Sequence, residues 1–371
     1  MNNSKTIIMG GGLWGGLLAY HLTKFRPDIN FELHEKDNTL GGNHTWSFHQ
    51  SDLDSDSFQV IAPFIEKTWK GHSVFFPKHS RSLEMPYCSI TSEGFHRVLC
   101  ESIPSEKLFF KSQIRPEGLT NEIVIDASNQ DSLYGKCGYQ KFLGIEVELA
   151  EEHGLSIPIL MDAQVVQKDG YRFIYYLPWT SRRILIEDTR YSNNASLNLI
   201  ELEADIQSIL KQKNWKVEKV LRKESGVLPI PIDPVSSQGN NISINLSGIF
   251  HDVTGYSLPD AVRLINELIK IQDWQRSTVL ECVNNYRQKR HRDRSFFRLL
   301  NRLLFQAAEP KLRYLVLSHF YELSQPLIER FYSGKMNKLD YIRIFMGKPP
   351  VKITSAIEAI FLGQKNTEEV L

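Results

Sequence analysis

Cysteine is scarce in this chain of 371 residues, and the few cysteines show no regular pairing. The four thiols are scattered and form no C-x-x-C pair; they are Cys88, Cys100, Cys137 and Cys282. Zinc ribbons and disulfide-stabilised secreted domains need cysteines at close, regular spacings. The scatter therefore argues against both frameworks and favours reduced thiols in the cytoplasm.

Long apolar runs and an excess of one charge are also missing. No stretch approaches the roughly 18 consecutive apolar residues that a membrane-spanning helix needs. The formal net charge is +1, which gives the whole chain no attraction to nucleic acid. We therefore expect no nucleic-acid partner, and any membrane contact has to be peripheral.

The N-terminal residues carry the arrangement that dinucleotide-binding proteins use. An apolar strand at residues 6–9 precedes Gly10, Gly12 and Gly15 in G-x-G-x-x-G spacing, and a helix and a second strand ending on Glu35 follow. Gly10 permits a tight turn, Gly12 lets a pyrophosphate approach the backbone, and Gly15 lets helix and strand pack closely. The helix N-terminus favours phosphate. Glu35 can accept hydrogen bonds from ribose hydroxyls, which favours FAD or NAD; the alternative is a glycine-rich turn without a ligand.

A paired glycine follows this fingerprint and predicts a loop. Gly41 and Gly42 permit close backbone approach, and His44 and Trp46 stand just beyond them. We expect this loop to fold over the cofactor. No carboxylate or cysteine stands at ligand spacing from His44 and His49, so we expect no metal site.

Two later segments are further candidates for cofactor contact. An apolar strand at residues 123–127 ends on Asp126 and Ala127, and Asp126 either meets the cofactor or caps a buried strand. Thr254 and Gly255 form a turn before a helix expected at about residues 260–270, and a helix start is a natural anion site.

The middle of the chain has the period-two alternation of β-strands. It is clear at residues 143–149, 171–177 and 183–189. The sequence therefore predicts an α/β protein in which a Rossmann-like FAD/NAD(P)-binding domain is interleaved with an antiparallel β-sheet substrate domain. We place the first domain at residues 1–58, 85–138 and 225–285, the second at 59–84 and 139–224, and a helical C-terminal region at 286–371.

Arginines crowd residues 287–302, beside a stripe of Phe296, Leu299, Leu300, Leu303 and Leu304 at helical spacing. Such a basic amphipathic stretch is typical of a helix on an anionic membrane surface. It is equally typical of a core-facing helix with a solvated basic side. Nucleic-acid binding is a weaker interpretation, because no stacking platform accompanies the arginines.

Several segments together resemble the bacterial lycopene β-cyclases of carotenoid synthesis. They are MGGGLWGGLLAYHL, LGGNHTWSFH, ITSEGF, YYLPWTSRRILIEDT, GVLPI, VTGYSLP, FFRLLNRLLF, PLIERFYSGK and GKPPV. The resemblance runs from about residue 5 to about residue 352. It implies reduced FAD used without net redox change, NAD(P)H as reductant, lycopene and related acyclic carotenoids as substrates, a peripheral membrane location and contact with other carotenoid enzymes.

The reaction that this resemblance implies needs a protonated acid beside a polyene end. An apolar pocket disfavours the charged form of a carboxyl group and keeps it protonated. Glu187 in ILIEDT is our candidate for the acid, with Asp188 and Glu224 as lesser candidates. The alternative for Glu187 is an ion pair with Arg182 or Arg183.

Aromatic faces and the exclusion of water would protect the cation formed from the polyene. Tyr175, Trp179 and Tyr256 are candidates for an aromatic lining, and ordinary core packing is the alternative for each. A different activity also fits the cofactor: an FAD-dependent hydroxylase or saturase acting on a hydrophobic isoprenoid. A third alternative is a non-catalytic protein that binds flavin or isoprenoid.

Overall fold

The N-terminal fingerprint forms the centre of a parallel sheet. The computed structural model describes residues 4–115, 119, 122–128, 135–233, 242–244 and 249–346. Strand β1 (Thr6–Met9) is buried throughout and pairs in parallel with β2 (Phe31–His34) and β9 (Ile123–Asp126). The flanking strands β8 (Leu108–Phe109) and β15 (Ile242–Ser243) complete the order β15-β9-β1-β2-β8. The predicted succession of strand, glycine turn, helix and strand is confirmed.

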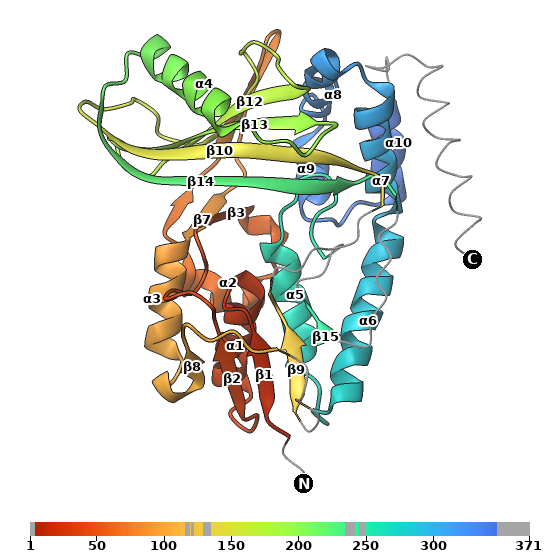
Figure 1. The fold of residues 1–371 in the computed structure, drawn as a ribbon. Coiled ribbons are helices and arrows are strands. Elements are labelled where there is room, and N and C mark those ends of the chain that lie inside the picture. The colour runs from red at the N-terminus through yellow and green to blue at the C-terminus, as the bar shows by residue number, and fades with distance from the viewer. Residues whose placement is uncertain are drawn as a thin grey trace.

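Helices pack around this sheet and bury its apolar side chains. They are α1 (Leu13–Phe25), α3 (Ser92–Ser102), α5 (Leu258–Leu268) and α6 (Arg276–Asp293), in the lower half of Figure 1. Helix α1 contacts both α3 and α5, and α5 contacts α6. Leucine and isoleucine side chains of these helices and of β1, β2 and β9 share one core. The core holds the glycine turn at the sheet's carboxyl edge, where ligands bind in open α/β sheets.

A larger sheet lies at the other end of the molecule (Figure 1). Its order is β14-β10-β13-β12-β11-β5-β6, with only β11 and β5 parallel. The strands are β5 (His72–Phe76), β6 (His79–Leu83), β10 (Cys137–Leu149), β11 (Ile159–Asp162), β12 (Tyr171–Pro178), β13 (Arg183–Ser192) and β14 (Val217–Pro231). The strands predicted at residues 143–149, 171–177 and 183–189 are confirmed as parts of β10, β12 and β13. Helix α4 (Leu199–Gln212) covers one face of the sheet.

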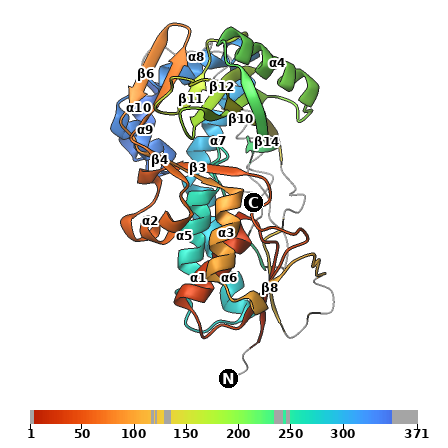
Figure 2. The same cartoon turned by 90° about the vertical axis from the view of Figure 1, so that its left-hand side faces the viewer.

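A three-stranded sheet joins the two halves, as both cartoon views show (Figures 1 and 2). It contains β3 (Thr45–His49), β7 (Tyr87–Thr91) and β4 (Lys67–Trp69), and the short helix α2 (Ser55–Ile61) follows β3. The predicted loop over the cofactor is therefore shorter than expected. It ends before Thr45, because β3 pairs with β7 from that residue onward.

The C-terminal helices pack against the large sheet. They are α7 (Ser295–Arg302), α8 (Arg313–Phe320), α9 (Gln325–Tyr332) and α10 (Lys338–Phe345), with a π-helical turn at Leu303–Ala307 after α7. Phe297, Leu304 and Phe305 are buried against aromatic residues of the sheet. Phe296, the first residue of the predicted apolar stripe, is only partly buried and stacks on Tyr341 with ring centres 4.1 Å apart.

Several of the clustered arginines face inward rather than forming an exposed basic surface. Arg290 and Arg294 pair with Asp260, and Arg294 and Arg298 approach Asp252 at 3.5 Å. Arg294 and Arg298 are buried. Buried charges need such partners, so this part of the stretch is a structural ion network.

The strands cross some of the predicted boundaries. Strand β14 continues through residue 225, so that boundary falls inside a strand of the large sheet. The GKPPV segment and the rest of the predicted C-terminal region beyond residue 346 lie outside the described residues. Within the described residues, no helix is long and apolar enough to cross a membrane.

Candidate active site

The glycine turn leaves an open cradle at the start of α1. Gly10 has a φ of +94°, which side chains disfavour, and a Cβ at Gly15 would lie 1.9 Å from the carbonyl oxygen of Gly10. A Cβ at Gly12 would meet no atom within 4 Å. Gly10 and Gly15 therefore serve the turn itself, while Gly12 faces free space beside the helix N-terminus. This geometry fits the pyrophosphate of a dinucleotide.

Glu35 supports the turn from the end of β2. Its carboxylate accepts hydrogen bonds from the backbone N–H of Gly11 at 2.6 Å and of Asp37 at 3.0 Å. The side chain is buried and also lines the cavity described below. The structure thus adds a contact with the turn that sequence reasoning did not predict, since only a ribose contact was expected.

The other predicted cofactor residues divide into two groups. Gly41, Gly42, Thr254 and Gly255 line the same cavity as Gly10 and Gly12. The carboxylate of Asp126 instead accepts hydrogen bonds from Ser128 N and Oγ, at 2.9 and 2.6 Å. Its neighbours Ala127 and Ser128 reach the cavity, whereas Asp126 is not part of the lining.

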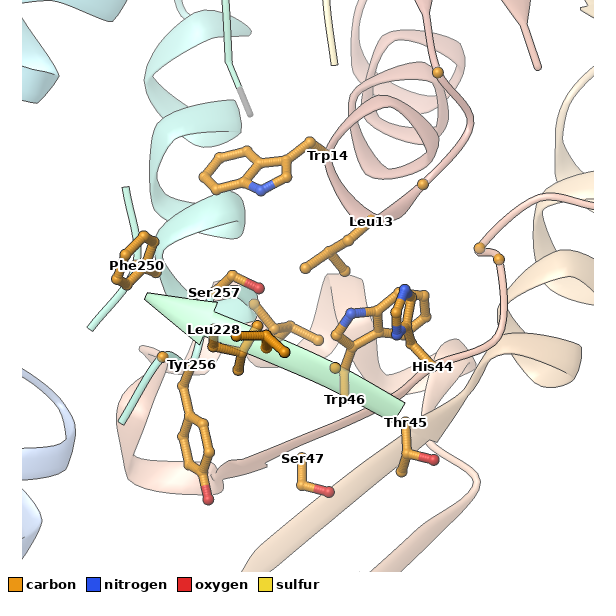
Figure 3. A pocket seen from close by; sticks show the side chains of 18 of the residues that line it. Leu13, Trp14, His44, Thr45, Trp46, Ser47, Leu228, Phe250, Tyr256 and Ser257 are labelled. Carbon is orange, nitrogen blue, oxygen red and sulfur yellow. The ribbon is translucent and has the colours of Figure 1, made fainter. Parts of the chain in front are cut away.

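One cavity of about 1300 Å³ connects the glycine turn with the large sheet. Figure 3 shows Leu13 and Trp14 at the start of α1, Phe250 and Ser257 ahead of α5, and Leu228 on β14. His44 and Trp46 line it as expected of this segment. The space therefore reaches from the predicted dinucleotide site to the face of β10, β12, β13 and β14 opposite α4.

Glu187 lies on the cavity face of β13. Its carboxylate accepts a hydrogen bond from Thr189 Oγ1 at 2.5 Å. Burial, and then the negative charge of Glu224, raise the pKa of Glu187 from 4.5 to about 8. This shift favours the protonated form of Glu187 at neutral pH. Arg182 and Arg183, the alternative partners, pair with Glu218 and Glu146 instead.

The two lesser candidates for the acid occupy different settings. Asp188 points to the opposite face of β13, is fully buried, and pairs with Arg172 at 2.7 Å. Glu224 on β14 pairs with Arg222 at 2.7 Å and accepts a hydrogen bond from Thr45 Oγ1 at 3.3 Å. Neither residue belongs to the cavity lining.

Tyrosines surround the cavity near Glu187. The hydroxyl of Tyr87 lies 3.2 Å from that of Tyr175 and 3.0 Å from that of Tyr256, and Tyr175 also donates to Ser47 Oγ at 3.2 Å. Burial raises the pKa of Tyr256 to about 12, so these phenols remain neutral. Tyr175 and Tyr256 line the cavity as predicted. Trp179 does not; it packs on Trp69 with ring centres 5.7 Å apart.

Sequence reasoning missed several residues that shape the site. Tyr87 gave no signal, because a buried strand of mixed residues does not show which ring faces a cavity. Gly144 did give one: an isolated glycine in a strand often marks close approach. It lies between Glu187 and Glu224 in the sheet. Within the described residues, no group of three or more His, Cys, Asp or Glu side chains could hold a metal ion.

Comparisons with known proteins agree with the topology and identify the family. A tryptophan 6-halogenase from Streptomyces toxytricini has a TM-score of 0.59 at 13% identity, with 99% of this chain and 97% of the halogenase covered. A geranylgeranyl bacteriochlorophyll reductase-like protein from Thermoplasma acidophilum has a TM-score of 0.53 at 13% identity, with coverages of 99% and 100%. These likenesses show the fold, and the predicted fold class is confirmed.

The sequence comparisons are more specific. A lycopene beta-cyclase from Pseudescherichia vulneris is 37% identical over 371 residues, which cover 95% of this chain and 96% of that relative. The family model described as lycopene cyclase protein matches residues 6–358. The chain therefore belongs to the lycopene cyclase family.

Proposed function

We propose that this protein is a lycopene β-cyclase that converts the acyclic ends of lycopene to β-ionone rings, giving γ-carotene and then β-carotene. The observation that carries the proposal is the position of Glu187, a carboxyl group with a raised pKa, in an aromatic cavity that also reaches a dinucleotide cradle. Membership of the lycopene cyclase family supports the same activity.

Glu187 is the proposed acid. Its proton is added to the terminal double bond of the polyene, and the next double bond of the chain attacks the resulting cation and closes the ring. A ring carbon then loses a proton, so one proton enters and one leaves without net redox change. The enzyme is accordingly an intramolecular lyase or isomerase. The neutral side chains of Tyr175 and Tyr256 line the cavity, where the π face of an aromatic ring would favour a nearby cation.

FAD in its reduced form is the proposed cofactor, with NAD(P)H as reductant. Gly10, Gly12 and Gly15 would shape its pyrophosphate site, Gly41, Gly42, Thr254 and Gly255 would line its path, and Glu35 and the segment ending at Asp126 would border it. Anionic reduced flavin would supply negative charge beside the developing cation. The FAD-binding domain would comprise residues 1–58, 85–138 and 225–285, with β14 shared with the substrate sheet.

Membrane contact is part of the proposal because lycopene is a hydrocarbon carried in membranes. We infer a cytoplasmic protein held peripherally at the inner face of the membrane, where other carotenoid enzymes act. Exposed apolar side chains on α10, among them Leu339 and Ile342, support such a contact. Because several arginines of residues 287–302 face inward, the basic surface of this segment is smaller than the sequence indicated. Lys289 and Arg292 remain exposed there.

Pigment analysis of bacterial cells that accumulate lycopene tests this function. We expect the wild type to produce γ- and β-carotene, and Glu187→Gln to leave lycopene unchanged while retaining normal abundance and flavin content. Glu218→Gln removes an exposed carboxylate on β14 and should behave as the wild type. Conversion by the Glu187→Gln protein would refute the acid assignment. A flavin-loaded wild type that leaves lycopene untouched, or yields oxygenated or saturated product, would refute the cyclase function.

A further inference from the structure

Four strands of the large sheet place an ordered row of residues on the cavity face. Tyr175 on β12 lies opposite Glu187 on β13, Glu187 lies opposite Gly144 on β10, and Gly144 lies opposite Glu224 on β14. Neighbouring strands are about 4.8 Å apart. The two glutamates are therefore separated by a single strand, and the residue between them has no side chain.

Gly144 lets the carboxylate of Glu224 extend over the intervening strand. A Cβ at Gly144 would lie 3.1 Å from Glu224 Cγ and 3.5 Å from Glu224 Oε1. The other carboxylate oxygen, Oε2, is the one that contacts Arg222 and Thr45. One oxygen of Glu224 is thus anchored, while the other is directed over Gly144.

Glu224 is paired with an arginine that is itself held in place by several partners. Arg222 pairs with it at 2.7 Å and is fixed in turn by Glu146 at 3.3 Å and by hydrogen bonds to Thr45 and Asn43. Burial raises the pKa of Glu224 above its ordinary value, and Arg222 and the hydrogen bond from Thr45 oppose that rise. The planar guanidinium and its fixed partners favour the ionised carboxylate.

We propose that Glu224 is a positioning residue whose anchored negative charge, across Gly144 from Glu187, keeps the acid protonated between turnovers. This inference rests on the proposed function, since the proton kept on Glu187 is the one given to the polyene. Once Glu187 has lost that proton, two carboxylates face each other across one strand. Their repulsion favours return of a proton to Glu187, which balances the proton released from the ring.

The other groups around Glu187 do not supply this effect. Tyr175, Tyr191 and Tyr256 face it as neutral phenols, because burial raises the pKa of each hydroxyl. Asp188 adds a smaller negative contribution from the opposite face of β13, where it is paired with Arg172. Glu224 is therefore the principal anion acting on Glu187 within the described residues.

The pH dependence of cyclisation by purified, flavin-loaded protein tests this role. The alkaline limb of the wild-type profile should lie near pH 8, where Glu187 loses its proton. In Glu224→Gln the limb should move to lower pH by about one unit or more, because the opposing charge is gone and Arg222 is less neutralised. Glu224→Asp keeps a charge one methylene further away, so its limb should fall between the other two. Glu218→Gln is the matched control on the same strand and should not move it.

An infrared titration gives a readout that does not need turnover. The carbonyl band of protonated Glu187 is identified as the band that is missing from Glu187→Gln. The pH at which half of this band has disappeared should be lower in Glu224→Gln than in the wild type. An unchanged midpoint, or a uniformly slower enzyme with an unmoved alkaline limb, would overturn the proposal while leaving the cyclase function intact. If the wild type does not cyclise lycopene but the midpoint is still lower in Glu224→Gln than in the wild type, the function is refuted and the coupling between the two glutamates is kept. Should the glutamine variant not fold, the same comparison applies to Glu224→Asp.

Discussion

Replacing Glu187 by glutamine should stabilise the protein at alkaline pH, although it removes the proposed acid. Burial and the charge of Glu224 raise the pKa of Glu187 from 4.5 to about 8. A carboxyl group whose pKa is higher in the folded protein than in the unfolded chain stabilises the fold fully at a pH below its pKa in the unfolded chain. This stabilisation is lost as the pH rises through its pKa in the folded protein. Above that pH, the folded wild type carries a charge in a poorly solvated site, whereas glutamine carries none.

The difference between the pKa of Glu187 in the unfolded chain and in the folded protein sets the size of the expected gain in unfolding free energy. Each pH unit corresponds to about 1.36 kcal/mol, so the rise from 4.5 to about 8 gives an upper bound of about 5 kcal/mol. Glu187 is only partly buried and lines an open cavity, where solvent screens part of this cost. We expect the glutamine variant to gain about 1–3 kcal/mol in unfolding free energy at about pH 9 and almost nothing at about pH 4.

Urea unfolding followed by tryptophan fluorescence across this pH range measures the difference. Both proteins should carry the same flavin content, because a bound ligand stabilises the native state by mass action. Glu218→Gln is the control and should stay within about 0.5 kcal/mol of the wild type at every pH. A stability gain that does not change with pH, or a wild type that is the more stable protein at alkaline pH, would refute the reasoning.

Two further substitutions test the cradle and the far face of β13. Gly12→Val should fold, because a Cβ there meets no atom within 4 Å. The valine should fill the space left for the pyrophosphate, so the purified variant should lack the flavin absorbance band. A normal flavin content would contradict this placement. Asp188→Asn should lower the unfolding free energy by about 3–5 kcal/mol, because it leaves Arg172 buried without its main partner. Urea unfolding checks this, and an unchanged midpoint would refute it.

Local patterns in the sequence were enough to predict the elements that hold the cradle. The apolar strand at β1, the spacing of Gly10, Gly12 and Gly15, and the helix after them depend on neighbouring residues only. Alternation with period two likewise located β10, β12 and β13. These features follow from backbone geometry, which acts over a few residues.

Pairing between distant segments could not be predicted in the same way. The position of Glu224, one strand away from Glu187, depends on the register of two separate strand pairs that meet at Gly144. The arginines of α6 and α7 looked like a surface patch because their partners, Asp252 and Asp260, stand well before them in the chain. A charged residue in a sequence does not show which distant residue neutralises it, and helical spacing alone cannot separate a solvated face from a buried ion network.

The alternation of β13 decides which of two adjacent carboxyl groups becomes available for chemistry. Ile184 and Ile186 pack under α4, and this fixes Asp188 on the same face, where Arg172 meets it. Glu187 consequently faces the cavity. A shift of one residue in the pairing of β13 would exchange the two faces. It would place Asp188 among the tyrosines and Glu187 beside the arginines, so Asp188 would become the cavity carboxyl group and Glu187 the one paired with Arg172. The apolar packing of α4 against the sheet, remote from the cavity, therefore determines which of the two carboxyl groups faces the proposed catalytic position.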